Sequence, residues 1–387
     1  MSRLSPKLHQ ILVRLGLVTG SLLVFGLAAE LLLRAFPVLL PAGAYYGSGR
    51  YDAELGFYLP DAPVIYNKSR YLVRTPNRDG FMDVEHDPLP VDGVTGDGLR
   101  IGFFGDSYVE SIQVPLEQTF FRRLPAKLDG QAVEPFAFGI SGLGTLHSLL
   151  LYRQMAPRYG LDVVVYLFVE NDPGDHLHRL QVGRAGLHTP RPTAIPSPQP
   201  PGFEILQATA PEQKPFYLRA AMMAKNHLLF ARVVYARLQL LWRRPAGEPG
   251  PTRPTARDLP GSWPTDLRAE AETVTSRILE RFQDEVEQSG RQFLVLYVPR
   301  GTEAVDGRVP ASDTWLPWLR ETCRGLGIDL LDPTPDLRAR LQAGDAVYDD
   351  HWTPAGHEVI ARVTARKLQE RLPQQLQQRI DDGDDNK

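Results

Sequence analysis

The sequence has 387 residues, of which 43% are hydrophobic and 23% are charged, and its formal net charge is -3. This length is enough for one large hydrophobic core and a second small unit, and the charge gives no reason to expect nucleic acid as a partner. The single cysteine, Cys323, excludes an internal disulfide and a thiolate metal cluster.

The N-terminal stretch is long and apolar enough to cross a membrane. Residues Leu15 to Ala29 carry no charge, and the apolar character resumes after Glu30 and continues to Leu40. A helix of about 20 such residues spans a bilayer. Glu30 lies one helical turn from Arg34, so the two charges can pair in or near the membrane. We expect a cytoplasmic N-terminus and transmembrane anchor over residues 1–40.

The charges around this stretch predict its orientation. Arg3, Lys7 and Arg14 precede it, while only Arg34 and Arg50 follow it closely. By the positive-inside rule, the N-terminus is cytoplasmic and the bulk of the chain is extracytoplasmic, in the periplasm or at the cell surface. Two alternatives stay open: a cleaved signal peptide that leaves a mature chain beginning near residue 29, and a buried helix of a soluble domain.

Residues 41–98 form a loop-rich preface in which aromatic side chains alternate with glycines. Polar residues lie among the aromatics, which favours a small core over an aromatic belt at the membrane surface. The aromatic residues are Tyr45, Tyr46, Tyr51, Phe57 and Tyr58.

From Leu99 onward, strand and helix patterns alternate. Short apolar runs predict strands that are buried on both faces, and an apolar stripe from Leu267 to Val286 predicts a long helix. Strand-helix alternation predicts a three-layer α/β/α fold with a mostly parallel central sheet. The predicted strands begin at Leu99 and then comprise Pro135 to Phe138, Val163 to Val169, Phe293 to Val298 and Ile328 to Leu331.

A proline-flanked insertion interrupts this pattern at about residues 181–265. It contains an apolar helical stretch from about Phe216 to Arg243. We expect this insertion to pack on the sheet or to form a lid, although its apolar content also permits contact with a membrane surface. The last helix begins after Thr353, its N-cap, and residues 374–387 form an acidic tail that we expect to be disordered.

Polar or glycine-rich segments follow three of the predicted strands. Ser107 follows the first strand within Gly-Asp-Ser, a loop containing Gly142 follows the second, and Asn171 follows the third. Ligands of open parallel sheets bind beyond the carboxyl ends of the strands, and His351, in the loop before the last helix, can reach the same edge. Each of these residues taken singly also fits an ordinary turn or strand end. Together they suggest a serine nucleophile with a histidine base.

Four segments resemble the successive sequence blocks of the SGNH (GDSL) hydrolase superfamily, in a membrane-anchored branch whose last block reads D-x-H-W. They read FGDSYVES, FGISGLGT, FVEND and DDHWTPAGH, and the resemblance covers residues 99–180 and 293–368. It implies an SGNH-type domain at residues 99–373 with a flavodoxin-like sheet. It also implies Ser107 as nucleophile and His351 as general base, with an oxyanion hole formed by the Ser107 N–H, Gly142 and Asn171.

The carboxylate of the triad departs from the pattern of many members, because Tyr348 stands three residues before the histidine. Asp349 instead gives the D-x-H spacing seen in polysaccharide O-acetyltransferases of the superfamily. We choose Asp349 over the adjacent Asp350. We interpret His357 and Asp172 as structural. Neither a metal nor an organic cofactor is called for by the sequence.

The predicted function is a membrane-anchored, extracytoplasmic serine esterase that hydrolyses O-acyl esters through a Ser107-His351-Asp349 triad. Its partner would be a small acyl ester or an acylated glycan. Two alternatives stay open: an O-acyltransferase that modifies a cell-surface polysaccharide, and a catalytically silent envelope assembly protein on the same scaffold.

Overall fold

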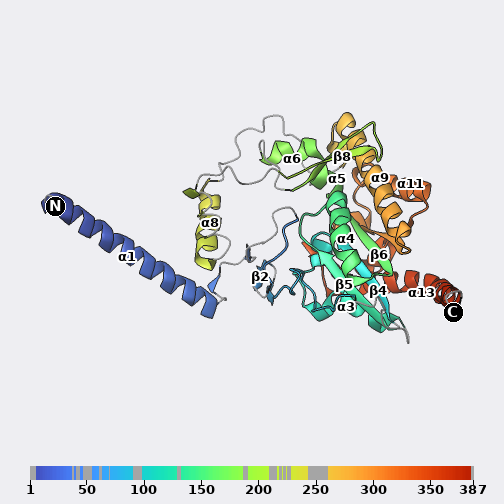
Figure 1. Cartoon of the computed structure of the whole chain (residues 1–387), viewed down its shortest axis with the longest axis horizontal. Coiled ribbons are helices and arrows are strands. Elements are labelled where there is room, and N and C mark those ends of the chain that lie inside the picture. Colours follow the sequence, from blue (N-terminus) through green and yellow to red (C-terminus); the bar gives the residue numbers. More distant parts are fainter. Residues whose placement is uncertain are drawn as a thin grey trace. The chain divides into compact units, whose positions relative to one another are not determined.

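In the computed structural model the chain divides into two compact units. Figure 1 labels the helices and strands. One comprises Met1–Gly49, Val64–Tyr71 and Glu212–Gly250, and the other comprises Arg50–Pro63, Leu72–Pro211 and Pro251–Lys387. The structure describes residues 6–36, 39–40, 44–46, 55–60, 63–68, 70–89, 98–128, 132–185, 191–208, 216–217, 220, 224, 228–242 and 260–384.

The larger unit is built on a five-stranded sheet in the order β10-β9-β6-β4-β5. Every neighbouring pair is parallel, which confirms the predicted mostly parallel sheet. β4 is paired with β5 on one side and β6 on the other, so the segments that follow these three strands are neighbours at one edge. The strands are β4 (Leu99–Gly105), β5 (Val133–Gly139), β6 (Val163–Val169), β9 (Gln292–Val298) and β10 (Asp329–Leu331).

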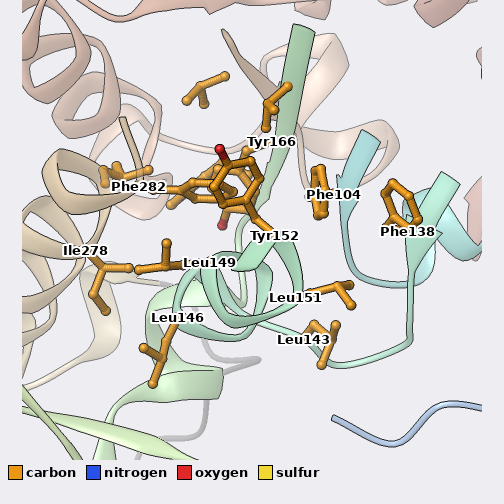
Figure 2. Packing of buried hydrophobic residues seen from close by; sticks show 14 of the residues in the cluster. Phe104, Phe138, Leu143, Leu146, Leu149, Leu151, Tyr152, Tyr166, Ile278 and Phe282 are labelled. Atoms are coloured by element: carbon orange, nitrogen blue, oxygen red, sulfur yellow. The ribbon is translucent and has the colours of Figure 1, made fainter. Parts of the chain in front are cut away.

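Two hydrophobic cores cover the two faces of the sheet. Successive strand residues point to opposite faces, so Phe104 belongs to one core and Phe103 to the other. On the first face, Phe282 of α9 (Thr265–Gln288) packs against Tyr152 of α4 (Thr145–Tyr159) and against Tyr166 of the sheet (Figure 2). The second face is covered by α13 (Pro354–Asp384), α12 (Thr334–Gln342) and α3 (Phe120–Arg123). This confirms the three-layer α/β/α architecture.

The remaining elements of this unit are short. They are α2 (Ser107–Glu110), α5 (Asp172–His176), α6 (His178–Ala185), α10 (Thr302–Asp306), α11 (Leu316–Leu326), the hairpin β7 (Thr193–Pro196) and β8 (Phe203–Leu206), the hairpin β11 (Tyr348–Asp349) and β12 (His351–Trp352), and 3-10 turns at Leu116–Gln118, Pro125–Lys127, Pro260–Ser262 and Ala311–Asp313.

Helix α13 extends further than its apolar pattern indicates. It continues to Asp384 and so includes residues 374–384 of the expected acidic tail, whose disorder stays a prediction. Glutamine, leucine and arginine between residues 374 and 380 have high helix propensity, which accounts for the continuation of the helix beyond the packed part of α13. Residues 385–387 of the predicted tail lie outside the described residues.

The smaller unit contains α1 (Pro6–Ala35), the strands β1 (Ala44–Tyr46) and β2 (Val64–Asn67), and α8 (Leu229–Trp242). β1 and β2 pair antiparallel, and β2 precedes β3 (Tyr71–Arg74) at the boundary between the units. Among the described residues, Leu12–Ala35 is the helical segment with the length and composition of a membrane span, a test that an N-terminal signal sequence also passes.

The predicted insertion and preface are only partly described. The insertion contributes β7 and β8 to the larger unit and α8 to the smaller one. α8 corresponds to the second half of the helix expected from residue 216 to residue 243. Residues 186–190, 209–215 and 243–259 of the insertion lie outside the described residues, as does Tyr51 of the preface.

Candidate active site

Ser107 is placed by a sharp turn from β4 into α2. Gly105 is required at this turn, because a Cβ there would come within 2.9 Å of a methyl group of Val109. Asp106 caps α2, since its carboxylate accepts a hydrogen bond of 2.9 Å from the backbone N–H of Tyr108. As a result, the Ser107 side chain is partly exposed at the carboxyl end of the central strand.

His351 lies directly against Ser107 although 244 residues separate them along the chain. Its Nε2 is 2.8 Å from Ser107 Oγ. The ring also packs against Tyr108, with 4.7 Å between ring centroids. A ring that carries its proton on Nδ1 accepts the hydroxyl hydrogen at Nε2, which is the arrangement that a general base requires.

The carboxylate paired with Nδ1 of His351 belongs to Asp350. Its Oδ2 lies 3.5 Å from Nδ1, beyond hydrogen-bond distance, and Nδ1 has no hydrogen-bond partner. Asp350 occupies the turn between β11 and β12 with a φ of 64°, a left-handed conformation that aspartate tolerates better than most residues. Asp349 is exposed, and its Cα is paired with that of His351 across the hairpin.

The loop after β5 is held in place by Glu110, a residue that sequence reasoning missed. The Glu110 side chain is buried, accepts a 3.3 Å hydrogen bond from the Ser141 N–H and also accepts the Ser141 hydroxyl. Tyr58 donates its hydroxyl to the same carboxylate at 2.6 Å. A carboxylate three residues after Ser107, directly following Tyr108 and Val109, was the available signal.

Two further contacts define the backbone around Gly142. Its φ of 75° lies in the left-handed region that favours glycine. Arg191 donates to the carbonyl oxygens of Gly142 and Ser141, the latter at 3.1 Å. These bonds tie the loop to the start of the β7 hairpin, and sequence reasoning did not single out Arg191.

Asn171 lies on the other side of Ser107, after β6, and its amide is engaged by carboxylates. Nδ2 donates to Asp175 at 2.6 Å, and the amide also hydrogen-bonds to Asp106. Burial raises the pKa of Asp106 to about 6, while the N–H of Tyr108, the charge of His351 and the Asn171 bond oppose this rise. Binding of an oxyanion by this amide therefore requires exchange of one of these bonds.

The two residues interpreted as structural are buried close to the site. Asp172 accepts the Tyr166 hydroxyl and the Val169 N–H, and burial raises its pKa. His357 accepts the Phe120 N–H at 3.2 Å and stacks on the Phe120 ring, and burial lowers the pKa of its imidazole to about 3. Within the part of the chain that the structure describes, no group of three or more potential metal ligands lies together.

The C-terminal part of the chain matches a known family. Residues 263–381 match the model described as the SGNH hydrolase-like domain of the acetyltransferase AlgX. This match confirms the predicted resemblance to the SGNH hydrolase superfamily, whereas the branch with a D-x-H-W block stays a prediction. The matched segment includes the hairpin that carries His351. No curated protein matches the sequence.

Several solved structures are similar over about 70% of this chain. The acetyl xylan esterase AlAXEase is 12% identical with a TM-score of 0.37, covering 69% of this chain and 98% of its own. A lipase/acylhydrolase from Enterococcus faecalis is 11% identical with a TM-score of 0.36, covering 70% and 96%. The esterase EstA from Pseudoalteromonas sp. is 10% identical with a TM-score of 0.37, covering 71% and 98%.

Proposed function

We propose that this protein is a membrane-anchored, extracytoplasmic serine esterase that hydrolyses O-acyl esters. The observation that carries the proposal is the 2.8 Å contact between Ser107 Oγ and His351 Nε2 at the carboxyl end of a parallel sheet. A serine hydroxyl is a weak nucleophile until a neighbouring base accepts its proton, and this contact supplies the base. The match to an SGNH hydrolase-like domain supports the same chemistry.

The reaction follows from these groups. Ser107 Oγ attacks the acyl carbonyl carbon while its proton moves to His351 Nε2, and the carbonyl oxygen becomes an oxyanion. His351 then returns the proton to the departing alcohol, so the carbon–oxygen bond of the ester breaks and an acyl-serine remains. A water molecule, deprotonated by His351, attacks the acyl-serine, releases the acid and restores the Ser107 hydroxyl.

The oxyanion would be held by the Ser107 N–H, Gly142 and Asn171. Ser107 leads the segment after β4, and the other two belong to the segments after β5 and β6, the strands that flank β4 in the sheet. Loss of one preorganised donor typically costs ~10²- to 10³-fold in rate.

For the carboxylate of the triad, we propose Asp350 in place of Asp349. The 3.5 Å approach of its Oδ2 to His351 Nδ1 supports this assignment. A negative charge there stabilises the imidazolium that forms when the serine proton is transferred, and it favours the tautomer with a proton on Nδ1.

Labelling of the nucleophile tests the esterase proposal. Full-length protein in detergent is treated with a fluorescent fluorophosphonate and assayed with p-nitrophenyl acetate. Ser107→Ala and His351→Ala should abolish labelling and hydrolysis, whereas Ser197→Ala, at a partly exposed serine of the β7–β8 hairpin, should label like the wild type. Full labelling of Ser107→Ala would refute the proposal.

A second candidate function is transfer of the acyl group to a hydroxyl of a cell-surface polysaccharide. It is favoured by the family match, whose model is named for an acetyltransferase. Chemically it differs only in the second step, where an acceptor hydroxyl replaces water. A polysaccharide acceptor that is esterified at the expense of acid release would establish transfer. Unchanged acid release and no esterified sugar, across acceptors of different composition, would leave hydrolysis as the function.

The anchor is the third part of the proposal. α1 has the length and composition of a span, and basic residues precede it. We expect full-length protein to stay in the membrane fraction after carbonate extraction. A soluble mature form that begins near Ala29 would instead identify a cleaved signal peptide.

A further inference from the structure

Helix α8 in the smaller unit has an apolar face that no role in catalysis explains. Val234 and Leu238 lie one turn apart and are 40% and 37% exposed, and Tyr235 beside them is 43% exposed. The exposed face of a helix in a soluble domain is normally polar. Arg232 and Arg237 are the charged residues of α8, which contains no acidic residue.

The first turn of α8 is bound to a carboxylate inside the apolar span of α1. Glu30 accepts hydrogen bonds from the backbone N–H groups of Leu229 at 3.1 Å and Phe230 at 2.8 Å. Arg34 donates to the same carboxylate at 2.7 Å. These partners leave Glu30 7% exposed, in a helix whose other described side chains are mostly exposed.

This arrangement explains how a charged residue is accommodated in the span. A carboxylate within a membrane helix is costly to insert, and such residues are normally paired. Glu30 pairs with Arg34 and with two backbone N–H groups at the start of α8. The N–H groups at the start of a helix have no acceptor within that helix.

The contacts also fix the depth of α8 relative to the span. Glu30 lies five residues before Ala35, the last residue of the span, which corresponds to about 8 Å along the helix axis. Phe230 packs edge-to-face on Phe25, with 5.9 Å between ring centroids, and Phe25 lies about 15 Å from the same end. The start of α8 therefore lies at the level of hydrocarbon whenever α1 spans a bilayer.

We infer that α8 is a second membrane-inserted element. It lies in the extracytoplasmic leaflet beside α1, and lipid acyl chains cover the apolar face of α8. At 14 residues it is about 21 Å long, too short to cross a hydrocarbon core of about 30 Å. Its arginines, followed in the sequence by Arg243 and Arg244, suit contact with lipid phosphates. The inference rests on the proposed anchor and extends it from one helix to two.

Site-directed spin labelling of the full chain in nanodiscs tests this inference. Cys323, the only cysteine, is replaced by alanine, and a nitroxide is attached at Val234→Cys or Leu238→Cys. Leu23→Cys on the exposed side of α1 reports the anchor, and Gln288→Cys at the exposed end of α9 reports water. Accessibility to oxygen, which concentrates in lipid, is compared with accessibility to a water-soluble nickel chelate.

We expect oxygen-to-nickel ratios at Val234 and Leu238 within about twofold of the ratio at Leu23 and well above that at Gln288. Ratios like that of Gln288, with Leu23 in lipid, would refute insertion of α8 while leaving the anchor intact. Protection of both positions from both reagents would mean that protein covers this face, which also overturns the inference. Water accessibility at Leu23 would instead refute the anchor itself.

A second variant tests the link between the helices. Glu30→Ala removes the acceptor for the first two N–H groups of α8, so the ratio at Val234 should fall. Arg34→Ala leaves that acceptor in place and serves as the control. An unchanged ratio in Glu30→Ala would show that Glu30 does not hold α8 beside α1.

Discussion

The carboxylate that supports His351 can be identified by exchanging two adjacent aspartates. Asp350 Oδ2 lies 3.5 Å from Nδ1 of the imidazole, whereas Asp349 gives the D-x-H spacing. Asp350→Asn removes the charge and keeps the size of the side chain. Asp349→Asn is a matched control, because it makes the same chemical change one residue away.

The expected loss of activity in Asp350→Asn follows from the distance between Asp350 and His351 and from the exposure of the Asp350 side chain. Two unit charges 3.5 Å apart attract by about 1 kcal/mol in water and by about 5 kcal/mol at an effective dielectric constant of about 20. The Asp350 side chain is 47% exposed, so the value lies toward the lower limit, at roughly 1 to 3 kcal/mol. Asp350→Asn should therefore lower kcat/KM by about 5- to 150-fold.

The assay is hydrolysis of p-nitrophenyl acetate together with the rate of fluorophosphonate labelling, with all variants compared at the same pH. Both rates should fall together in Asp350→Asn and stay within about threefold of wild type in Asp349→Asn, a change of under 1 kcal/mol. If Asp349→Asn lost more activity than Asp350→Asn, the electrostatic argument would be refuted and the D-x-H aspartate would be the third member of the triad.

Three further predictions concern residues around Ser107. Glu110→Gln takes an acceptor away from Ser141, so kcat should fall with little change in KM and roughly 1 to 3 kcal/mol of stability should be lost, measured by steady-state kinetics and urea unfolding. An unchanged kcat would show that Glu110 does not position the loop. Asp106→Asn should flatten the dependence of stability on pH. Burial raises the pKa of Asp106 from 3.8 to about 6, so the folded state binds the proton more tightly and the wild-type free energy of unfolding decreases as pH rises through this interval, by roughly 1 to 3 kcal/mol. An identical pH profile in the variant would contradict this assignment. In Gly139→Ala, the added methyl group would lie 2.6 Å from the backbone carbonyl carbon of Val109 and closer still to the backbone nitrogen of Glu110. This clash should cost about 1 to 3 kcal/mol of stability, measured by thermal or urea unfolding. Gly98→Ala, whose nearest neighbour would be at 3.4 Å, is the control and should be nearly neutral.

The secondary structure of the larger unit could be predicted because its signals are local. The run from Val163 to Val169 is apolar throughout, and it forms a strand of the same bounds, buried on both faces. The second strand begins at Val133, two residues before the predicted start, because Val133 and Glu134 pair with Leu99 and Arg100 of β4. The ends of a strand depend on its pairing with strands far along the chain, and a local sequence pattern does not record this pairing.

The candidate site, too, could be predicted from the sequence only in part. The segments that carry Ser107, Gly142 and Asn171 could be placed at one sheet edge, since each follows a recognisable strand. Which aspartate approaches His351 depends on the left-handed turn at Asp350, and the Glu110 contact with Ser141 joins residues 31 apart.

The sequence by itself determined the apolar span, the parallel α/β architecture and the residue types that serine chemistry needs, because composition and periodicity are properties of neighbouring residues. Only the tertiary structure decided that His351 meets Ser107 across 244 residues and that Glu30 binds the start of α8, 199 residues away. These contacts arise from packing and from the need of buried polar groups for partners, and both act between segments whose separation the sequence pattern does not record.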